Sequence, residues 1–374
     1  MGLALRGVDK VVGGETHLKG IDLTFETGSR NVLLGRTLAG KTTLLRIMAG
    51  LDRPTRGRIL VDGVDVTGVS VRKRGIAMVY QQFINYPSLT VYENIASPLR
   101  RSGLKKNDID RRVRETAEIL HLEALLERLP AELSGGQQQR TAIARALVKD
   151  AQLLLLDEPL VNLDYKLREE LRVELQEIFR RRSAIVVYTT TEPSEALMLG
   201  GHVVVVDQGR VLQSGPTAAV YQRPENLRVA EVFSDPPINA LHSEVSGGRA
   251  FMGDRIPVPL SGHLKDLPDG VYRFAFRSHH LWLSRQETDD IAVEGNVELA
   301  EINGSETFVH VQHDDSSFVV QQEGVHPFAM GSPITVYLNA KHLFAYDAEG
   351  LLVAAPPAAP SPAQRQPGDA HGAH

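Results

Sequence analysis

The segment VLLGRTLAGKTTLL, residues 32–45, constrains the fold of this chain more than any other stretch. It carries the spaced pattern G-x-x-x-x-G-K-[ST], made of Gly35, Gly40, Lys41 and Thr42, between a short apolar run and a helical pattern. A strand, a glycine-rich loop and a helix in this order place backbone N–H groups and a helix N-terminus around a phosphate. We therefore predict an α/β fold that binds a nucleotide.

The residues of this loop have separate expected roles. Lys41 meets the β and γ oxygens of ATP, and the Thr42 hydroxyl takes a position at Mg²⁺, so ATP and Mg²⁺ are the expected cofactors. A glycine turn that matches by chance is the alternative, which the flanking strand and helix disfavour. The expected nucleotide-binding residues of the loop are Gly35, Arg36, Thr37, Leu38, Ala39, Gly40, Lys41, Thr42 and Thr43.

Short apolar runs alternate with helical patterns, which predicts a mainly parallel, buried sheet. Between residues 86 and 130 such runs are absent, and the charged stretch KKNDIDRRVRETAEILHLEALLERL predicts a helical insertion there. The apolar runs are NVLL (31–34), IAMVY (76–80), QLLLL (152–156), AIVVY (184–188) and HVVVVD (202–207).

The run LLLLDEP ends in two adjacent acids that suit nucleotide chemistry. Asp157 is the expected Mg²⁺ ligand, and Glu158 is the candidate base for the attacking water. A solvated strand end is the alternative. Four leucines that lead two carboxylates out of a buried strand favour the site.

The pattern changes after residue 236, to short alternating segments punctuated by Gly and Asp, such as VYRFAFR, TFVHVQ and ITVYL. These predict a small all-β barrel domain over residues 236–353. The segment 354–374 has too little apolar surface to fold and is predicted to be a disordered tail. At 374 residues, two folded units are expected, the first over residues 1–233.

Composition excludes several classes of partner and chemistry. The formal net charge of -5 leaves no basic excess for a phosphate backbone, so nucleic acid is not expected as a partner. The absence of cysteine excludes disulfides, thiolate nucleophiles and cysteine zinc sites. No apolar run reaches the ~20 residues needed to cross a bilayer, and the first residues do not form a signal peptide, so a cytoplasmic chain is expected.

The segment LSGGQQQR, residues 133–140, stands just before LLLLDEP, and with it the chain resembles an ABC-type ATPase from about residue 3 to residue 233. The resemblance implies that this signature segment acts on ATP held by the other subunit of a dimer. It also implies that Gln81 senses Mg²⁺ and water and that Asp164 lies in a loop crossing the dimer interface, although Val161 departs from the family pattern. The signature residues expected to bind nucleotide are Ser134, Gly135, Gly136 and Gln137.

The helical insertion resembles the subdomain that docks a membrane permease. It includes a charged run with Arg111, Arg112 and Arg114. Taken alone, this run is a solvated helix face.

Three departures from the family pattern fall in the chain's own nucleotide site. Leu38 replaces a glycine, at a cost of roughly 1–2 kcal/mol if the position requires positive φ. Residues 8–17 offer no aromatic ring to stack on adenine, a contact worth about 1–3 kcal/mol. Thr191 stands where the family has a histidine that reaches the γ-phosphate. With Glu158 and Gln81 as the other catalytic candidates, these changes predict an impaired site in an asymmetric heterodimer with an unlike ATPase subunit.

The β domain looks like the OB-like regulatory domain of sugar and polyol importers, although Ser278 and His279 follow Arg277 where Pro and Glu are common. A generic β barrel used for dimer contact is the alternative. The segments VGGE, VYQQFINYPSLTVYENIASPLR and YTTTEPSEALMLGG resemble ATP-binding subunits of bacterial glycerol importers. That resemblance implies two permease subunits, a periplasmic solute-binding protein and a place on the cytoplasmic face of the inner membrane. A silent nucleotide-binding scaffold and a non-transport ABC ATPase remain the alternative functions.

Overall fold

The structure, a computed structural model, describes residues 2–82, 84–100, 102–161, 163–253 and 256–357. It divides into two compact units, of which the first ends at Ala218 and the second begins at Ala219. The boundary that we predicted, at residues 233–236, lies later than this division. The physical reason is α8 (Leu227–Val232), whose buried Ala230 packs with Ile238 and Tyr346 of the second unit.

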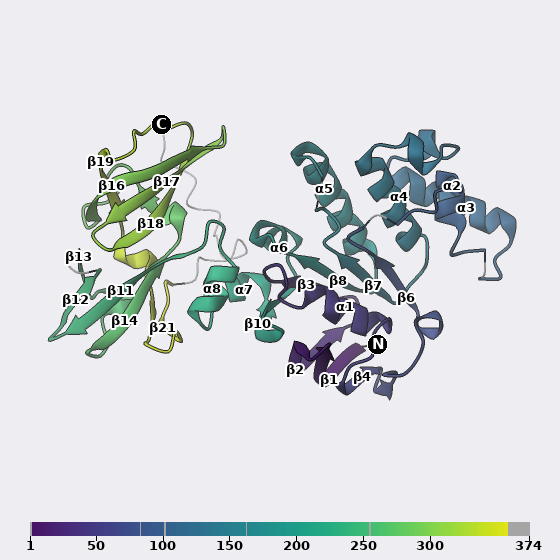
Figure 1. Cartoon of the computed structure of the whole chain (residues 1–374), viewed down its shortest axis with the longest axis horizontal. Helices are drawn as coiled ribbons and strands as arrows, with labels where there is room; N and C mark the ends of the chain where they lie inside the picture. Colours follow the sequence, from purple (N-terminus) through teal and green to yellow (C-terminus); the bar gives the residue numbers. More distant parts are fainter. Residues whose placement is uncertain (1, 83, 101, 162, 254–255, 358–374) are drawn as a thin grey trace, which may run out of the picture. The chain divides into compact units, whose positions relative to one another are not determined.

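A six-stranded sheet forms the centre of the first unit, in the order β10-β9-β3-β8-β7-β6 (Figure 1). The strands from β9 to β6 pair in parallel, and β10 pairs with β9 antiparallel. All five predicted apolar runs form the parallel strands, which confirms the predicted buried sheet. The bounds are β3 (Arg30–Leu34), β6 (Ile76–Val79), β7 (Leu153–Asp157), β8 (Ile185–Thr190), β9 (His202–Asp207) and β10 (Arg210–Pro216).

Helices and a second sheet cover the two faces of this sheet. Leu44 and Met48 of α1 share a buried cluster with Leu33 and Val187 of the central strands, and the same cluster includes residues of β1 and β2. Figure 1 shows α5 and α6 on the opposite face from α1. The helices are α1 (Lys41–Ala49), α4 (Gly135–Leu147), α5 (Tyr165–Arg181) and α6 (Pro193–Leu199).

The second sheet of this unit is antiparallel, in the order β2-β1-β4-β5, and we did not predict it. Its strands are amphipathic, so one face joins the α1 cluster and the other is exposed. Apolar residues alternate with polar ones along β2, as in a half-buried strand. The bounds are β1 (Gly2–Val12), β2 (Glu15–Glu26), β4 (Arg56–Val61) and β5 (Val64–Asp65).

The predicted helical insertion contains α2 (Val91–Ala96) and α3 (Lys106–Ile119). The α2 helix begins with a capping box, in which the Thr90 hydroxyl accepts the N–H of Glu93 and the Glu93 carboxylate accepts the N–H of Thr90. On α3, Arg111 and Arg114 form exposed ion pairs with Asp108 and Asp110 of the same helix. The charged run therefore forms a solvated helix face, on which arginine and aspartate side chains pair with each other.

The second unit begins with α7 (Thr217–Gln222) and α8 and then contains strands in a barrel-like arrangement of two sheets around one core. The sheet orders are β13-β12-β11-β14-β20-β21 and β15-β19-β16-β17-β18. The bounds are β11 (Asn239–Ser246), β12 (Arg249–Met252), β13 (Ile256–Val258), β14 (Gly270–Phe276), β15 (Leu281–Trp282), β16 (Ile291–Ile302), β17 (Glu306–His313), β18 (Ser316–Glu323), β19 (Pro333–Leu338), β20 (Phe344–Tyr346) and β21 (Leu352–Ala354).

The folded part of this unit extends past the predicted start of the tail at residue 354. Ala354 ends β21, and both Ala354 and Ala355 are buried. The small apolar side chains of these two alanines fit into the core. The prediction used the average composition of residues 354–374, which does not reveal two buried residues at the start of the segment. The rest of the predicted tail, residues 358–374, lies outside the described residues. Across the part of the chain that the structure describes, no helix combines the length and apolarity needed to cross a bilayer.

Candidate functional site

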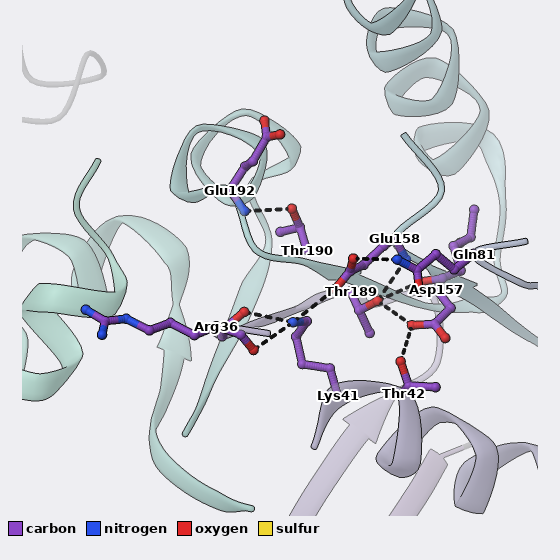
Figure 2. Close-up of polar contacts among 11 residues, drawn as sticks. Arg36, Lys41, Thr42, Gln81, Asp157, Glu158, Thr189, Thr190 and Glu192 are labelled. Atoms are coloured by element: carbon purple, nitrogen blue, oxygen red, sulfur yellow. Dashed lines mark hydrogen bonds and ion pairs between the residues drawn. The ribbon is translucent and has the colours of Figure 1, made fainter. Parts of the chain in front are cut away.

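Five of the predicted site side chains meet with Thr189 at the carboxyl ends of the parallel strands (Figure 2). In a parallel sheet, these ends meet at one edge, and the loops that follow them form the usual ligand site. Figure 2 shows side chains from the phosphate loop and the start of α1, from the segment after β6, and from the ends of β7 and β8 pointing toward one another. They are Lys41, Thr42, Gln81, Asp157, Glu158 and Thr189.

The two glycines of the loop are required by close backbone contacts. A Cβ on Gly35 would lie 2.3 Å from the carbonyl oxygen of Val206, and one on Gly40 would lie 2.9 Å from that of His17. Gly40 also has a φ of 104°, which favours glycine. Between them, buried Ala39 accepts the N–H of Gly209 at 3.0 Å. These contacts fix the loop on β9 and β2, directly before the N-terminus of α1.

Leu38 has the backbone conformation that a glycine would adopt without strain. Its φ is 67°, so the condition for the predicted cost of roughly 1–2 kcal/mol is met. The side chain is 96% exposed, and therefore packing does not offset this cost. Thr37 is also exposed, whereas Thr43 is half-buried at the start of α1.

Lys41 is buried in spite of its charge and is held by three oxygen atoms. Its Nζ lies 2.8 Å from the carbonyl oxygen of Gly35, 3.1 Å from that of Arg36 and 3.1 Å from Oε1 of Glu158. The Arg36 side chain points away from this cluster (Figure 2). The ammonium group is thus positioned inside the loop and paired with the candidate base.

Two of the three residues expected at Mg²⁺, Thr42 and Asp157, are in direct contact, whereas the third is Gln81. The Thr42 hydroxyl donates to Oδ1 of Asp157 at 3.0 Å, and the Thr189 hydroxyl donates to the same oxygen at 2.9 Å. Burial raises the pKa of the Asp157 carboxyl, and these two hydrogen bonds offset part of that rise. A divalent cation would offset the burial of this charge further, so the residues fit Mg²⁺.

Glu158, the candidate base, is held at both carboxylate oxygens. Oε1 pairs with Lys41, and Oε2 accepts a hydrogen bond from Nε2 of Gln81 at 3.2 Å. The backbone of Glu158 has a φ of 42°, a strained value for a residue with a side chain. Gln81 therefore contacts the candidate base in this structure, whereas no contact of Gln81 with Thr42 or Asp157 is seen among the described residues.

Thr191 follows the end of β8 and is half-buried. Its neighbours form contacts of their own. The Thr190 hydroxyl accepts the N–H of Glu192 at 2.9 Å, and the Glu192 carboxylate pairs with Arg168 of α5 at 2.6 Å. These contacts fix the turn that carries Thr191 to α5. At the position of the family histidine, the chain therefore has a hydroxyl group and no imidazole.

The signature segment lies at the N-terminus of α4, with Ser134 as the cap. The Ser134 hydroxyl accepts the N–H of Gln137, and the Gln137 side chain accepts the N–H of Ser134. Gly135 has open space where a Cβ would be, whereas a Cβ on Gly136 would lie 1.8 Å from Cδ2 of Leu167. Within the described residues, no hydrogen bond or ion pair joins this segment to the chain's own phosphate loop.

Asp164 is the N-cap of α5 and accepts the N–H of Leu167 at 2.9 Å. It is therefore placed next to the signature segment, since Leu167 contacts the position of Gly136. The β1–β2 turn exposes Val11 and Val12 and contains no aromatic residue. The predicted absence of an adenine-stacking ring thus holds for this turn.

Thr189 is the site residue that we did not predict. Residues 189–191 are three consecutive threonines, and the family histidine drew attention to Thr191 alone. The available signal was the position of Thr189 inside a buried strand, where a hydroxyl needs a partner. Its partner comes from the pairing of β8 with β7, which places Thr189 opposite Asp157.

Comparisons with known proteins agree with the two units. The family model of the ABC transporter matches residues 18–161, and that of the TOBE domain matches residues 274–345. The sn-glycerol-3-phosphate import ATP-binding protein UgpC of Yersinia enterocolitica is 38% identical over 352 residues, which cover 93% of this chain and 97% of the relative. The protein of the same name in Escherichia coli strain K12 is 36% identical over 351 residues, with 93% and 98% covered.

The first unit also resembles solved structures of an ATP-binding cassette. The dimeric, post-hydrolysis structure of MJ0796 bound to ADP and Pi has a TM-score of 0.52 and 30% identity, and covers 57% of this chain and 98% of that one. A second dimeric structure of MJ0796 has a TM-score of 0.53 and the same identity and coverage.

Proposed function

This chain belongs to the family of ABC transporter ATP-binding proteins, and we propose that it hydrolyses ATP to energise import of a polyol or its phosphate ester. The observation that carries the proposal is the convergence of Lys41, Thr42, Asp157 and Glu158 at one edge of the parallel sheet. The sequence resembles ATP-binding subunits of glycerol importers, and the similar proteins are named for import of sn-glycerol-3-phosphate. Both solutes contain glycerol. Glycerol or its phosphate is therefore the proposed solute.

The phosphate loop binds the triphosphate through the N-terminus of α1 and through Lys41. The first N–H groups of a helix have no intrahelical acceptor, and the first turn of α1 has no acidic side chain to cap them. Lys41 Nζ lies 3.1 Å from Oε1 of Glu158. A γ-phosphate competes for Lys41, so its arrival frees the Glu158 carboxylate to accept a proton from water.

Thr42 and Asp157 are the proposed protein ligands of Mg²⁺. Across the described ranges, no group of three His, Asp or Glu side chains is arranged to hold a metal ion without other ligands. Mg²⁺ prefers near-octahedral oxygen ligands and usually takes several from phosphate and water. The bound cation would neutralise charge on the phosphates, and Asp157 and Thr42 would fix its place beside Lys41.

We propose further that the chain's own site is slow and that its signature segment completes a faster site on an unlike ATPase subunit. Leu38 strains the loop, the β1–β2 turn offers no aromatic ring, and Thr191 has a hydroxyl that cannot become a cation. In contrast, Ser134 and Gln137 form a regular helix cap at the signature. These three changes fall around the chain's own phosphate loop, whereas the segment LSGGQQQR matches the family pattern, which supports division of labour.

A groove of about 630 Å³ supports docking of a permease on the first unit. It lies between the helical insertion and the central sheet and is lined in part by Tyr86, Leu89, Arg100, Arg145 and Lys149. Arg145 packs over the Tyr86 ring at 5.0 Å, and Lys149 donates to the carbonyl of Ile76. The lining combines apolar side chains with the cations Arg100, Arg145 and Lys149, which suits an acidic cytoplasmic segment of a permease. We therefore place the chain at the cytoplasmic face of the membrane, with two permeases and, indirectly, a periplasmic solute-binding protein.

A nucleotide-binding scaffold that completes only the partner's site is the second candidate. Thr191 favours it, because a threonine hydroxyl cannot become a cation at the γ-phosphate as the family histidine can. Glu158→Gln in the assembled transporter separates the two: unchanged transport-coupled turnover identifies the scaffold, and a lowered turnover identifies the ATPase.

The proposed impairment is tested by restoring the family residues in the purified full chain. We expect Leu38→Gly with Thr191→His to raise ATP turnover by about tenfold or more, because one positioned donor at developing charge is worth about 10²–10³ in other enzymes. Adding Glu158→Gln should remove the gain, which controls for a contaminating ATPase. Rapid turnover by the unmodified chain alone, at the level of the double variant, contradicts the asymmetric assignment.

A further inference from the structure

Thr189 lies at the centre of the site and is shielded from water. The residue is 0% exposed and pairs on one side with Leu33 of β3 and on the other with Asp157 of β7. A hydroxyl at such a place must be satisfied by the protein. The hydrogen-bond partners of the Thr189 hydroxyl therefore indicate its role.

The hydroxyl joins the two acidic residues of the site. It accepts the N–H of Glu158 at 2.9 Å and donates to Oδ1 of Asp157 at 2.9 Å. The carbonyl of Leu156 lies farther away, at 3.5 Å, and a hydroxyl has a single proton to give. The charged oxygen at the shorter distance takes that proton, since hydrogen bonds to ionised acceptors are stronger.

The bond to Glu158 acts where the backbone is strained. With a φ of 42°, the Glu158 backbone does not hold this conformation through its own preference. The N–H of Glu158 is anchored by Thr189, and its side chain then reaches Lys41 and Gln81. The direction of the candidate base thus depends on a hydroxyl from the neighbouring strand.

We propose that Thr189 is a positioning residue, whose hydroxyl fixes the Mg²⁺ ligand Asp157 and the backbone of the base Glu158 in one arrangement. The inference rests on the proposed function of this site. It implies that loss of the hydroxyl weakens the response to Mg²⁺ and lowers turnover, whereas it leaves nucleotide binding without Mg²⁺ nearly unchanged.

The test measures binding of a fluorescent ATP analogue to the purified full chain during a Mg²⁺ titration. Thr189→Val removes the hydroxyl at nearly constant shape and is expected to raise the Mg²⁺ concentration at half-maximal response by about tenfold. Thr189→Ser keeps the hydroxyl and is expected to stay within about twofold of the unmodified chain, since the same donor and acceptor remain.

Thr190→Val is the matched control, because Thr190 is the next residue of β8, is also buried, and also uses its hydroxyl twice. That hydroxyl accepts the N–H of Glu192 and bonds the Glu195 carboxylate, away from Asp157. We expect Thr190→Val to lower the melting temperature about as much as Thr189→Val does and to leave the Mg²⁺ response unchanged. Equal Mg²⁺ responses of these two variants would overturn the proposal.

An unmodified chain that binds no nucleotide refutes the proposed function, whereas normal binding with an unaffected Thr189→Val refutes this inference alone.

Discussion

Asp157 combines a charge that the site needs with a position that disfavours charge. It is the last residue of β7 and is almost fully buried among apolar strands. Its neighbours compensate only in part, through the hydroxyls of Thr42 and Thr189. Residues at active sites often give up stability in this way, because the arrangement is selected for the bound state.

Asp157→Asn is therefore expected to stabilise the nucleotide-free chain at neutral pH. Burial raises the folded-state pKa of this carboxyl, so its favourable contribution is present at low pH and is lost as pH rises from the ordinary pKa through the raised one. A neutral amide avoids that loss and still accepts both hydroxyls. Thermal unfolding against pH measures the gain, and the Mg²⁺ response of nucleotide binding should weaken by more than about tenfold.

Asp52→Asn is the control, because the folded-state pKa of Asp52 is lowered whereas that of Asp157 is raised. The hydrogen bond from Arg46 lowers the pKa of Asp52, so this carboxylate contributes stability above its ordinary pKa that disappears on acidification. We expect the amide to destabilise the chain at neutral pH by about 0.2–1 kcal/mol, the range of partly exposed ion pairs. A loss of stability in Asp157→Asn as well would contradict the role of burial at Asp157.

At the scale of elements, α4 and α5 meet through a glycine. Ser134 caps α4, Asp164 caps α5, and Leu167 of α5 fills the space that a side chain at residue 136 would need. The signature segment and the Asp164 turn are thus fixed to each other, although they are separate motifs in the sequence. A side chain at residue 136 would have to displace Leu167, whereas one at residue 135 meets open space.

This contact predicts different outcomes for two adjacent substitutions. Gly135→Ala meets open space and gains helix propensity, whereas Gly136→Ala places its Cβ 1.8 Å from Cδ2 of Leu167. We expect Gly136→Ala to be less stable than Gly135→Ala by about 1–3 kcal/mol, the usual cost of overpacking. Denaturant unfolding of the two chains measures the difference.

Leu167→Ala provides the matching rescue. It should restore most of the stability of Gly136→Ala, because it vacates the space that the new methyl group occupies. Equal stability of Gly135→Ala and Gly136→Ala would contradict the prediction, and so would a failure of Leu167→Ala to restore the stability of Gly136→Ala. Either result would show that α4 and α5 accommodate the methyl group without a loss of folding free energy.

At the scale of the whole molecule, the segment before the β strands belongs to the second unit. Tyr221 of α7 packs against Phe233, and the guanidinium of buried Arg277 lies 3.6 Å from the Tyr221 ring. Arg277 also donates to the carbonyl of Tyr221 at 2.6 Å. This segment therefore satisfies a buried cation, which explains why the unit begins near Ala219 and not at residue 236.

Two fragments of the chain test this boundary. A fragment of residues 217–357 should unfold cooperatively, whereas one of residues 236–357 leaves Arg277 without its ring and its carbonyl. We expect the shorter fragment to lose about 3 kcal/mol or more, from a cation–π contact and a charged hydrogen bond, and to melt about 10 °C lower. Calorimetry of both fragments measures this, and equal melting temperatures would place the boundary at residue 236.

Much of the first unit was predictable because its signals are local. Loop glycines, the apolar run before Asp157 and the signature segment each occupy a few consecutive residues, and each was found where the structure places it. The antiparallel sheet was missed because its strands pair across long separations, such as Leu3 with Val61. The boundary and the tail were misplaced for the same reason, since Ala230 and Ala355 are ordinary residues until their distant partners are known.

The sequence by itself determined the fold class and the phosphate loop with Lys41 and Thr42, because these depend on residues close together in the chain. The positive φ of Leu38, which the sequence left as a condition, was decided by the structure. Only the tertiary structure decided that Thr189 faces Asp157, that Lys41 pairs with Glu158, and that Leu167 packs against Gly136. Strand register and helix contact set these three contacts between segments far apart in the chain. Such pairings follow from the packing of the whole core, which no short stretch of sequence encodes.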